Sequence, residues 1–316
     1  MRKATPMKRL TSRTLLATAL LGMAASGAAL AQNTSGKLLA TGGVSSIEGS
    51  GGGGLTTWAL ISGYGTDRQI GANAHLTGLH LRDFSFETLG VAVGIHDWVE
   101  LSAAKQSFNT KNALVPINPA LRHYKLKQDV FGVKVRVAGD AVYDQDTWLP
   151  QIAVGVQFKD NKDDAVIPYL NTTLGGAGGA RIKHRGTDFY VAATKVILDK
   201  SLLVSGTLRF SKANQFGLLG FGGPDGDSYR PEFEGAAALL LRKDLAVGAE
   251  VRIKRGNLKN PALNLKEQTA ADLFVAWFPT KNVSVTAAYV DLGQVAGALT
   301  HNKRQAGGYL SVQAGF

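Results

Sequence analysis

Charged residues recur at every second position in several stretches of the sequence, and this spacing could build a polar lining. In LAVGAEVRIK, residues 245–254, the odd positions are apolar and the even positions include Glu250, Arg252 and Lys254. Alternate residues of a β-strand point to opposite faces, so these three charges would share one face. The same alternation elsewhere completes the predicted lumen-lining set of a barrel: Glu100, Lys134, Arg136, Arg209, Glu234, Glu250, Arg252 and Lys254.

This set of charges could serve one of two purposes. Rings of charged side chains in a pore tune ion selectivity. The basic excess at Lys134, Arg136, Arg252 and Lys254 favours small, weakly anionic solutes. Alternatively, acidic and basic residues on neighbouring strands neutralise one another and close a solvated interior. The sequence leaves both hypotheses open.

The sequence carries no enzyme motif that would assign catalysis to these residues. It has no G-x-S-x-G elbow, no H-E-x-x-H and no P-loop. The six histidines show no metal-ligand spacing, because His75 and His80 are five residues apart and would face opposite sides of a strand. We therefore expect neither an enzyme nor a cofactor or metal site.

Two predicted loops carry further groups of interest. The glycine-rich stretch NQFGLLGFGGPDGD, residues 214–227, holds apolar side chains that could fold into the bore as a constriction or contact a ligand. These are Phe216, Leu218, Leu219 and Phe221. Acidic residues also cluster in loops, where solvated charge is a simpler explanation than a divalent-cation site. These are Asp160, Asp163, Asp164, Asp225 and Asp227.

Residues 1–31 have the pattern of a cleaved export signal. Five basic residues flank the start of an apolar run at 15–25 that is too short to span a membrane, and Ala29-Leu30-Ala31 is a small-x-small cleavage site. The remaining residues, 32–316, have 30 basic and 24 acidic side chains, a net charge of +6 that does not favour nucleic-acid binding. The chain has no cysteine, so no disulfide can support the exported domain.

The elements that would position the charges are β-strands with a two-residue period. A tilted strand needs about 9 to 11 residues to cross a bilayer, whereas strands of soluble proteins are commonest at about 5 or 6. The predicted strands are long by this standard. They are 55–63, 70–81, 88–95, 99–108, 124–137, 148–159, 188–198, 202–211, 230–241, 245–254, 271–278, 283–290 and 304–316.

The connections between these strands alternate between short and long. Short ones include 96–98 and 198–201, and long ones include 160–185 and 212–228, as in outer-membrane barrels. Single-chain barrels of this type have an even number of strands, so a further strand at 36–46 would bring the total to about fourteen. Twelve strands is the alternative, if the N-terminal piece lies inside the barrel or one weak strand is not real.

The C-terminus predicts where the chain meets lipid. Its last residues alternate between apolar and polar, typical of the assembly signal of outer-membrane proteins: Leu310, Val312, Ala314 and Phe316. Trp98, Trp148 and Trp277 lie near predicted strand ends, where an aromatic girdle would sit. Lys195 shares the apolar parity of strand 188–198, so we expect it to snorkel at a membrane rim unless a bulge shifts the register.

Several stretches carry a family resemblance when taken together. They are KLLATGGVSSIEGSGGGGLTTWALISGYGT, VAVGIHDWVELSAAKQSFNT, KQDVFGVKVRVAGDAVYDQDTWLPQIAVGVQFK, KANQFGLLGFGG and LAVGAEVRIK. Over nearly all of 32–316 the chain resembles a proteobacterial outer-membrane family known as domain of unknown function 3034. The resemblance implies an outer-membrane location and a barrel. It implies no substrate and no catalytic residue.

The sequence therefore predicts an all-β protein, an antiparallel transmembrane β-barrel of about 14 strands with 12 as the alternative. We expect it in the outer membrane of a Gram-negative bacterium as a porin-like channel for small polar or weakly anionic solutes. A closed structural or interaction barrel acting through its extracellular loops is the alternative function. The expected partners are outer-membrane lipid, the barrel-assembly machinery during biogenesis and a small solute, with no nucleic acid.

Overall fold

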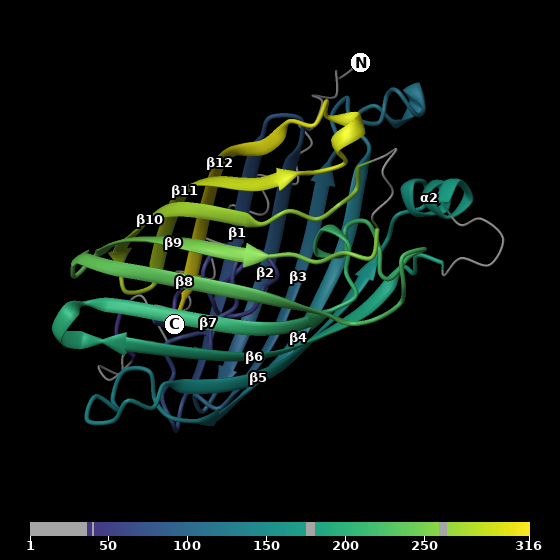
Figure 1. The fold of residues 1–316 in the computed structure, drawn as a ribbon. Coiled ribbons are helices and arrows are strands. Elements are labelled where there is room, and N and C mark those ends of the chain that lie inside the picture. Colours follow the sequence, from purple (N-terminus) through teal and green to yellow (C-terminus); the bar gives the residue numbers. More distant parts are fainter. Residues whose placement is uncertain (1–36, 40, 175–180, 259–263) are drawn as a thin grey trace, which may run out of the picture.

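The computed structural model describes residues 37–39, 41–174, 181–258 and 264–316, so the predicted signal peptide lies outside the described residues. Twelve antiparallel strands form one closed sheet in which β12 pairs with β1 (Figure 1). The strands are β1 (Ile70–Leu81), β2 (Ser85–Ile95), β3 (Val99–Asn109), β4 (Lys125–Ala138), β5 (Gln151–Asn161), β6 (Arg185–Ile197), β7 (Leu202–Ser211), β8 (Arg230–Arg242), β9 (Leu245–Ile253), β10 (Ala270–Thr280), β11 (Val283–Gln294) and β12 (Arg304–Gly315).

Helical segments occur only in the connections of the described chain. The helix α2 (Val166–Leu174) lies between β5 and β6. Short 3-10 turns are η1 (Pro119–Leu121), η2 (Leu198–Lys200), η3 (Gln215–Gly217) and η4 (Gly297–Leu299). No helix in this part of the chain is long and apolar enough to cross a membrane.

The prediction of about fourteen strands is wrong, and the twelve-strand alternative is confirmed. The predicted strand 55–63 and the described residues of the predicted strand 36–46 form no strand and make only isolated bridges. They lie inside the barrel, where Leu55, Ala59 and Ile61 are almost completely buried. We call residues 41–64 the plug. Unlike a strand of the wall, it has no exposed face, because nearly all of its residues are buried.

The other twelve predicted strands are all present, and the bounds of β1 and β7 agree with the prediction at both ends. Their two-residue period arises because one face of the sheet is turned to the plug and the other is apolar and exposed. In β9 and β10, Val251 is 40% exposed and Leu273 is 67% exposed, whereas Glu250 and Asp272 beside them are buried. An exposed apolar surface of this kind suits a lipid environment.

The two ends of the barrel differ. At one end, which we call the short-turn end, tight turns join four pairs of strands: β2–β3, β6–β7, β8–β9 and β10–β11. The last residue of the plug and the C-terminus both lie there, because the Phe316 carbonyl accepts hydrogen bonds from the backbone N–H groups of Tyr64 and Ala72, each at 2.9 Å. The loop end carries most of the long connections, although β1 and β2 are joined there by only Arg82–Asp83–Phe84, and the β4–β5 connection at the short-turn end is itself long, spanning 139–150.

The rim of the short-turn end holds Lys195 as predicted. Its Nζ donates to the carbonyl of Asp144, and to that of Leu149 at 3.2 Å, both in the β4–β5 connection. The lysine therefore reaches polar groups beyond the strand and does not leave a charge facing lipid. Trp98 and Trp148 are exposed at the same end, and Trp277 is exposed near the end of β10, as an aromatic girdle would require.

Candidate functional site in the barrel lumen

The plug is an irregular segment in the bore, so its backbone N–H and C=O groups need hydrogen-bond partners that strand pairing does not supply. Charged side chains of the wall supply them. Glu100 of β3 accepts from the N–H of Gly51 at 3.0 Å and of Ser62 at 2.9 Å. Lys134 of β4 donates to the carbonyls of Gly51 at 3.0 Å and Leu60 at 2.6 Å. The two wall residues also pair with each other at 3.0 Å.

The opposite wall holds the plug in the same way. Glu250 of β9 accepts from the N–H of Leu55 at 2.8 Å and from the Thr56 hydroxyl. Glu234 of β8 accepts from the N–H of Thr57 at 2.8 Å. These carboxylates thus bind plug backbone that would otherwise be buried without partners.

The glycine run of the plug is required by this close approach. A Cβ on Gly53 would lie 1.7 Å from Oε1 of Glu250, and a Cβ on Gly51 would lie 2.8 Å from Oε2 of Glu100. Only glycine lets backbone come this close to the wall carboxylates. The glycine run thus serves contact with the wall, and no strand flanks it on either side among the described residues.

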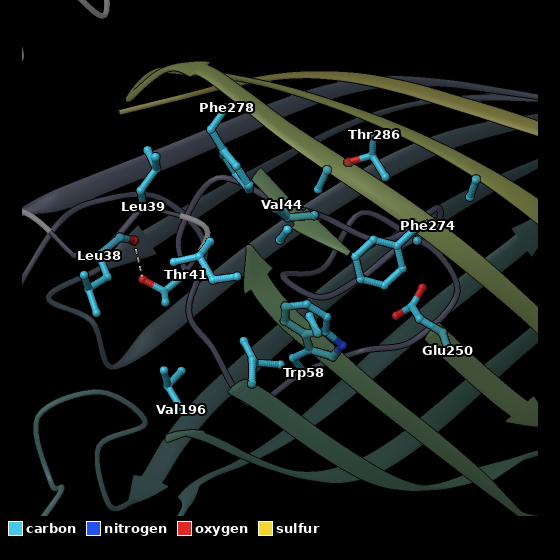
Figure 2. Close-up of a pocket in the computed structure, with 18 of the residues that line it drawn as sticks. Leu38, Leu39, Thr41, Val44, Trp58, Val196, Glu250, Phe274, Phe278 and Thr286 are labelled. Atoms are coloured by element: carbon cyan, nitrogen blue, oxygen red, sulfur yellow. Dashed lines mark hydrogen bonds between the residues drawn. The ribbon is translucent and has the colours of Figure 1, made fainter. Parts of the chain in front are cut away.

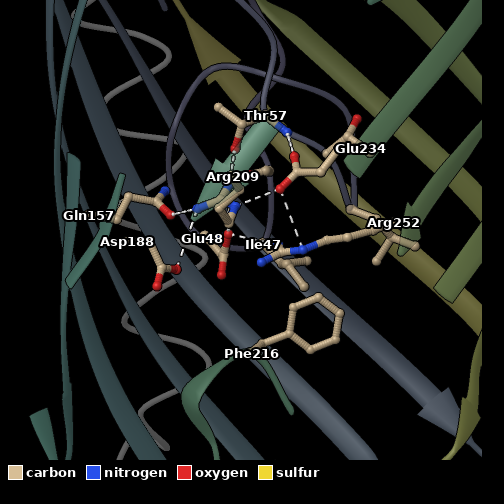
Figure 3. Close-up of polar contacts among 12 residues, drawn as sticks. Ile47, Glu48, Thr57, Gln157, Asp188, Arg209, Phe216, Glu234 and Arg252 are labelled. Atoms are coloured by element: carbon tan, nitrogen blue, oxygen red, sulfur yellow. Dashed lines mark hydrogen bonds and ion pairs between the residues drawn. The ribbon is translucent and has the colours of Figure 1, made fainter. Parts of the chain in front are cut away.

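At the centre of the lumen, Glu48 of the plug lies among three basic side chains of the wall. Figure 3 labels two of them, Arg209 and Arg252. Its carboxylate is 2.5 Å from Nζ of Lys159, 2.9 Å from Arg252 and 3.5 Å from Arg209. The side chain is only 1% exposed. Because buried charges are stable only when paired, this contact fixes the tip of the plug.

The wall residues around Glu48 alternate in sign. Arg209 pairs with Glu234 at 2.6 Å, Lys159 with Asp188 at 2.7 Å and Arg252 with Glu232 at 3.5 Å. We call these six side chains and Glu48 the central charge cluster. Its wall part holds three acids and three bases, so it is balanced even without the plug.

The eight residues predicted to line the lumen do not form one ring. Glu100, Lys134, Arg209, Glu234, Glu250 and Arg252 are buried against the plug. Lys254 lies towards the loop end, where Nζ donates to Oε1 of Gln215 at 2.9 Å. Arg136 lies at the short-turn rim, where it pairs with Asp97 at 2.9 Å and Asp140 at 3.0 Å and stacks on Trp98.

The sequence analysis did not single out Glu48, Lys159, Asp188 or Glu232. Lys159 and Asp188 lie on the inward parity of β5 and β6, so the period alone could have found them. Glu48 had no such signal, because the plug follows no single strand register.

The loop end of the lumen is filled by the β7–β8 connection. Residues 212–229, here the inner loop, fold inward and bury Phe216, Leu218 and Leu219. The ring of Phe216 lies 4.6 Å from the Arg252 guanidinium and 4.8 Å from Nζ of Lys254. The plug and the inner loop therefore meet at the central charge cluster and fill the bore from opposite ends.

The acidic loop residues pair with nearby groups. Asp163 accepts from the N–H groups of Val166 and Ile167 at the start of α2. Asp227 accepts from Lys183 at 2.5 Å, and this hydrogen bond lowers the pKa of its carboxyl against the opposing effect of burial. Within the described ranges there is no group of acidic and histidine side chains that could hold a metal ion.

The predicted C-terminal signal faces outward along β12. Leu310, Val312 and Phe316 are exposed on the barrel surface, and Ala314 shares their parity. The intervening Tyr309, Ser311 and Gln313 are buried in the lumen, and Gln313 accepts from the N–H of Ser45 in the plug at 2.7 Å. One face of the last strand is thus exposed on the outside of the barrel, and the other face contacts the plug.

Comparison with solved structures supports the fold. The NanC porin matches with a TM-score of 0.50 and 11% identity, covering 76% of this chain and 98% of that one. The KdgM porin has a TM-score of 0.47 at 10% identity, covering 77% and 99%. An outer-membrane channel from Pseudomonas putida F1 described as COG4313 has a TM-score of 0.47 at 9% identity, covering 78% and 94%. A comparison with curated proteins finds no match.

At 11% identity the match to the NanC porin shows a common architecture and nothing about solutes. In sequence, residues 41–313 match the model of a family described as protein of unknown function, DUF3034. That range begins at the first residue of the plug and ends within β12, so it includes the plug and nearly the whole barrel. The chain therefore belongs to the DUF3034 family and is a plugged, twelve-stranded β-barrel of the outer-membrane type.

Proposed function

We propose that the protein is an outer-membrane channel for small polar solutes, and that the docked plug keeps this channel closed. The observation that carries the proposal is how the plug is attached. Side chains of Glu100, Lys134, Glu234 and Glu250 bind its backbone, and no plug residue belongs to a barrel strand. The plug could therefore leave without breaking a single hydrogen bond between neighbouring strands. Its departure would expose the wall side chains of the central charge cluster to the short-turn end, and the inner loop would also have to move for a solute to pass.

The proposal places the short-turn end in the periplasm, since outer-membrane barrels have short periplasmic turns and longer external loops. The plug then enters from the periplasm and the inner loop from outside. Lipid surrounds the apolar outer face. The assembly machinery would read the outward residues of β12 that end at Phe316. The function includes no catalytic step.

The charge balance of the wall bears on the solute. The sequence analysis favoured weakly anionic solutes because of basic residues such as Lys134 and Arg252. Asp188, Glu232 and Asp272 are also buried in the lumen and offset that excess. We therefore propose polar solutes without a strong preference for either sign of charge.

A closed structural barrel is the second candidate, and the central charge cluster favours it. Its buried acids and bases satisfy one another, and the inner loop adds a second layer of filling above Phe216. A barrel of this kind would act through its loops and would never conduct.

Cysteine crosslinking of the plug distinguishes the two candidates, because the chain has no native cysteine. Ala59 of the plug and Ala153 of β5 belong to one small buried cluster, so we would replace both with cysteine. Planar-bilayer recordings would compare the refolded double variant before and after reduction. If the plug closes a channel, conductance steps of the double variant should appear when its disulfide is reduced and disappear when it is oxidised again.

The matched control is the single variant Ala59→Cys, which should conduct alike under both conditions. Steps that persist in the oxidised double variant would contradict a plug-gated channel. A correctly folded barrel that stays silent in both states, and at all applied voltages, would support the closed barrel instead.

A further inference from the structure

A cavity remains between the plug and the wall in the short-turn half of the barrel (Figure 2). It measures about 130 Å³. Most of its lining is apolar and comes from β6 to β10 and from the plug: Trp58, Val196, Leu203, Leu240, Phe274 and Phe278. An apolar cavity of about 150 Å³ in another protein is large enough to hold benzene, so this one suits a single ring.

Small inward residues create this space. Ala238, Ala246, Ala276 and Ala288 occupy wall positions where larger side chains would close it. The cavity reaches the short-turn end, because Leu38 and Leu198 border it and are 42% and 44% exposed. A molecule arriving from that side would meet these two leucines first.

The deep end of the cavity is acidic. Glu250 and Asp272 are opposite each other in the β9–β10 register, and both side chains border the cavity. Figure 2 shows Glu250 and Thr286 on the far side of the cavity from Leu38 and Leu39. Glu250 is held by the plug, but Oδ1 of Asp272 and the hydroxyl of Thr286 have no hydrogen-bond partner among the described residues.

These free acceptors lie in an otherwise apolar enclosure. Asp272 is only 5% exposed, and none of the basic side chains in the described part of the chain pairs with it or with Glu250. Two neighbouring carboxyl groups away from any cation favour a positive charge placed between them and the open acceptors. The faces of Trp58 and Phe274 would stabilise the same charge.

We propose that this cavity binds a small apolar molecule that ends in a protonated amine. The ring or short hydrocarbon would fill the space lined by Trp58, Phe274 and Phe278. The ammonium group would donate to Asp272 and Thr286. The site does not require the protein to conduct, because it forms with the plug in place and makes no use of an open bore.

The test uses the refolded mature protein in lipid nanodiscs, which avoids detergent in the cavity. Benzylamine is the probe, and isothermal titration calorimetry measures its dissociation constant. Asp272→Asn should weaken binding roughly 10- to 100-fold, the range for a hydrogen bond to a charged group. Ala276→Phe fills the cavity and should abolish binding. Asp291→Asn is the matched control, because Asp291 pairs with Arg304 at the far end of β11 and should leave binding unchanged.

Neutral and anionic analogues separate head-group recognition from general apolar uptake. Benzyl alcohol should bind more weakly than benzylamine, and benzoate should not bind. Equal binding of benzylamine and benzyl alcohol, or no effect of Asp272→Asn while Ala276→Phe blocks uptake, would overturn the amine assignment. Absence of saturable benzylamine binding to the folded protein would overturn the site altogether. Each result is independent of whether the channel conducts.

Discussion

Replacing Glu48 with glutamine should release the plug. Glu48 is the only plug carboxylate in the central charge cluster, and Lys159, Arg209 and Arg252 all approach it within 3.5 Å. Removing one partner from a buried ion pair costs about 3–5 kcal/mol. Arg209 and Arg252 keep Glu234 as a partner, so we expect the lower value, about 3 kcal/mol.

That free energy converts into a population of undocked plug. Each 1.4 kcal/mol is a factor of about ten, so the undocked fraction should rise roughly 100-fold. The assay is the labelling rate of Ala59→Cys by a membrane-impermeant maleimide, because Ala59 is fully buried while the plug is docked. The glutamine variant should label roughly 100-fold faster, in proportion to the undocked fraction.

Asp199→Asn provides the matched control, since Asp199 lies exposed in the turn between β6 and β7. It should leave the labelling rate unchanged. The reasoning is refuted if Glu48→Gln labels no faster than this control while the barrel remains folded. In that case the plug would be held by its other hydrogen bonds, and the ion pairs at its tip would add nothing measurable.

Three further predictions concern the wall, the glycine run and a loop. Val251→Arg places a charge on the outer face and should lower barrel stability in bilayers by about 2–4 kcal/mol in urea titrations, whereas Leu241→Arg at the rim should cost about 0–1. Gly53→Ala should loosen the plug and speed labelling at residue 59, and Gly206→Ala, where nothing lies within 4 Å, should not. Lys183 and Lys212 lower the pKa of Asp227, so hydrogen exchange of residues 212–229 should lose protection as the pH falls below about 4, and Lys183→Gln should weaken that dependence because Lys212 remains. Protection that is unchanged down to pH 3 would show that this pair does not hold the loop.

The wall of the barrel could be predicted because its strands obey one physical rule. Each strand faces two environments, so its polarity changes at every residue, and β1 and β7 were found with both of their ends. The prediction failed for 55–63, a segment in which every residue is buried. That segment packs within a bore, and its hydrogen bonds go to side chains such as Glu234 and Thr207. Periodicity cannot distinguish these two kinds of neighbour.

The site was only partly predictable for a related reason. Parity indicates that Arg209 and Arg252 point inward, but it does not say what they meet there. Their shared partner Glu48 is about 160 and 200 residues away along the chain, and only the closed barrel brings them together. The cavity beside Trp58 depends on the placement of the plug and therefore had no signal in the strand pattern.

The way the plug contacts the wall also bears on how the barrel is made. Closing the sheet requires β12 to find β1 across some 240 residues, the kind of distant pairing that folds slowly. The plug touches side chains as far apart as Thr88 in β2, Glu100 in β3, Glu250 in β9 and Gln313 in β12. The plug could therefore act as a template on which the strands of the wall assemble. The first part of the barrel domain to be synthesised could set the circumference before the last strand arrives.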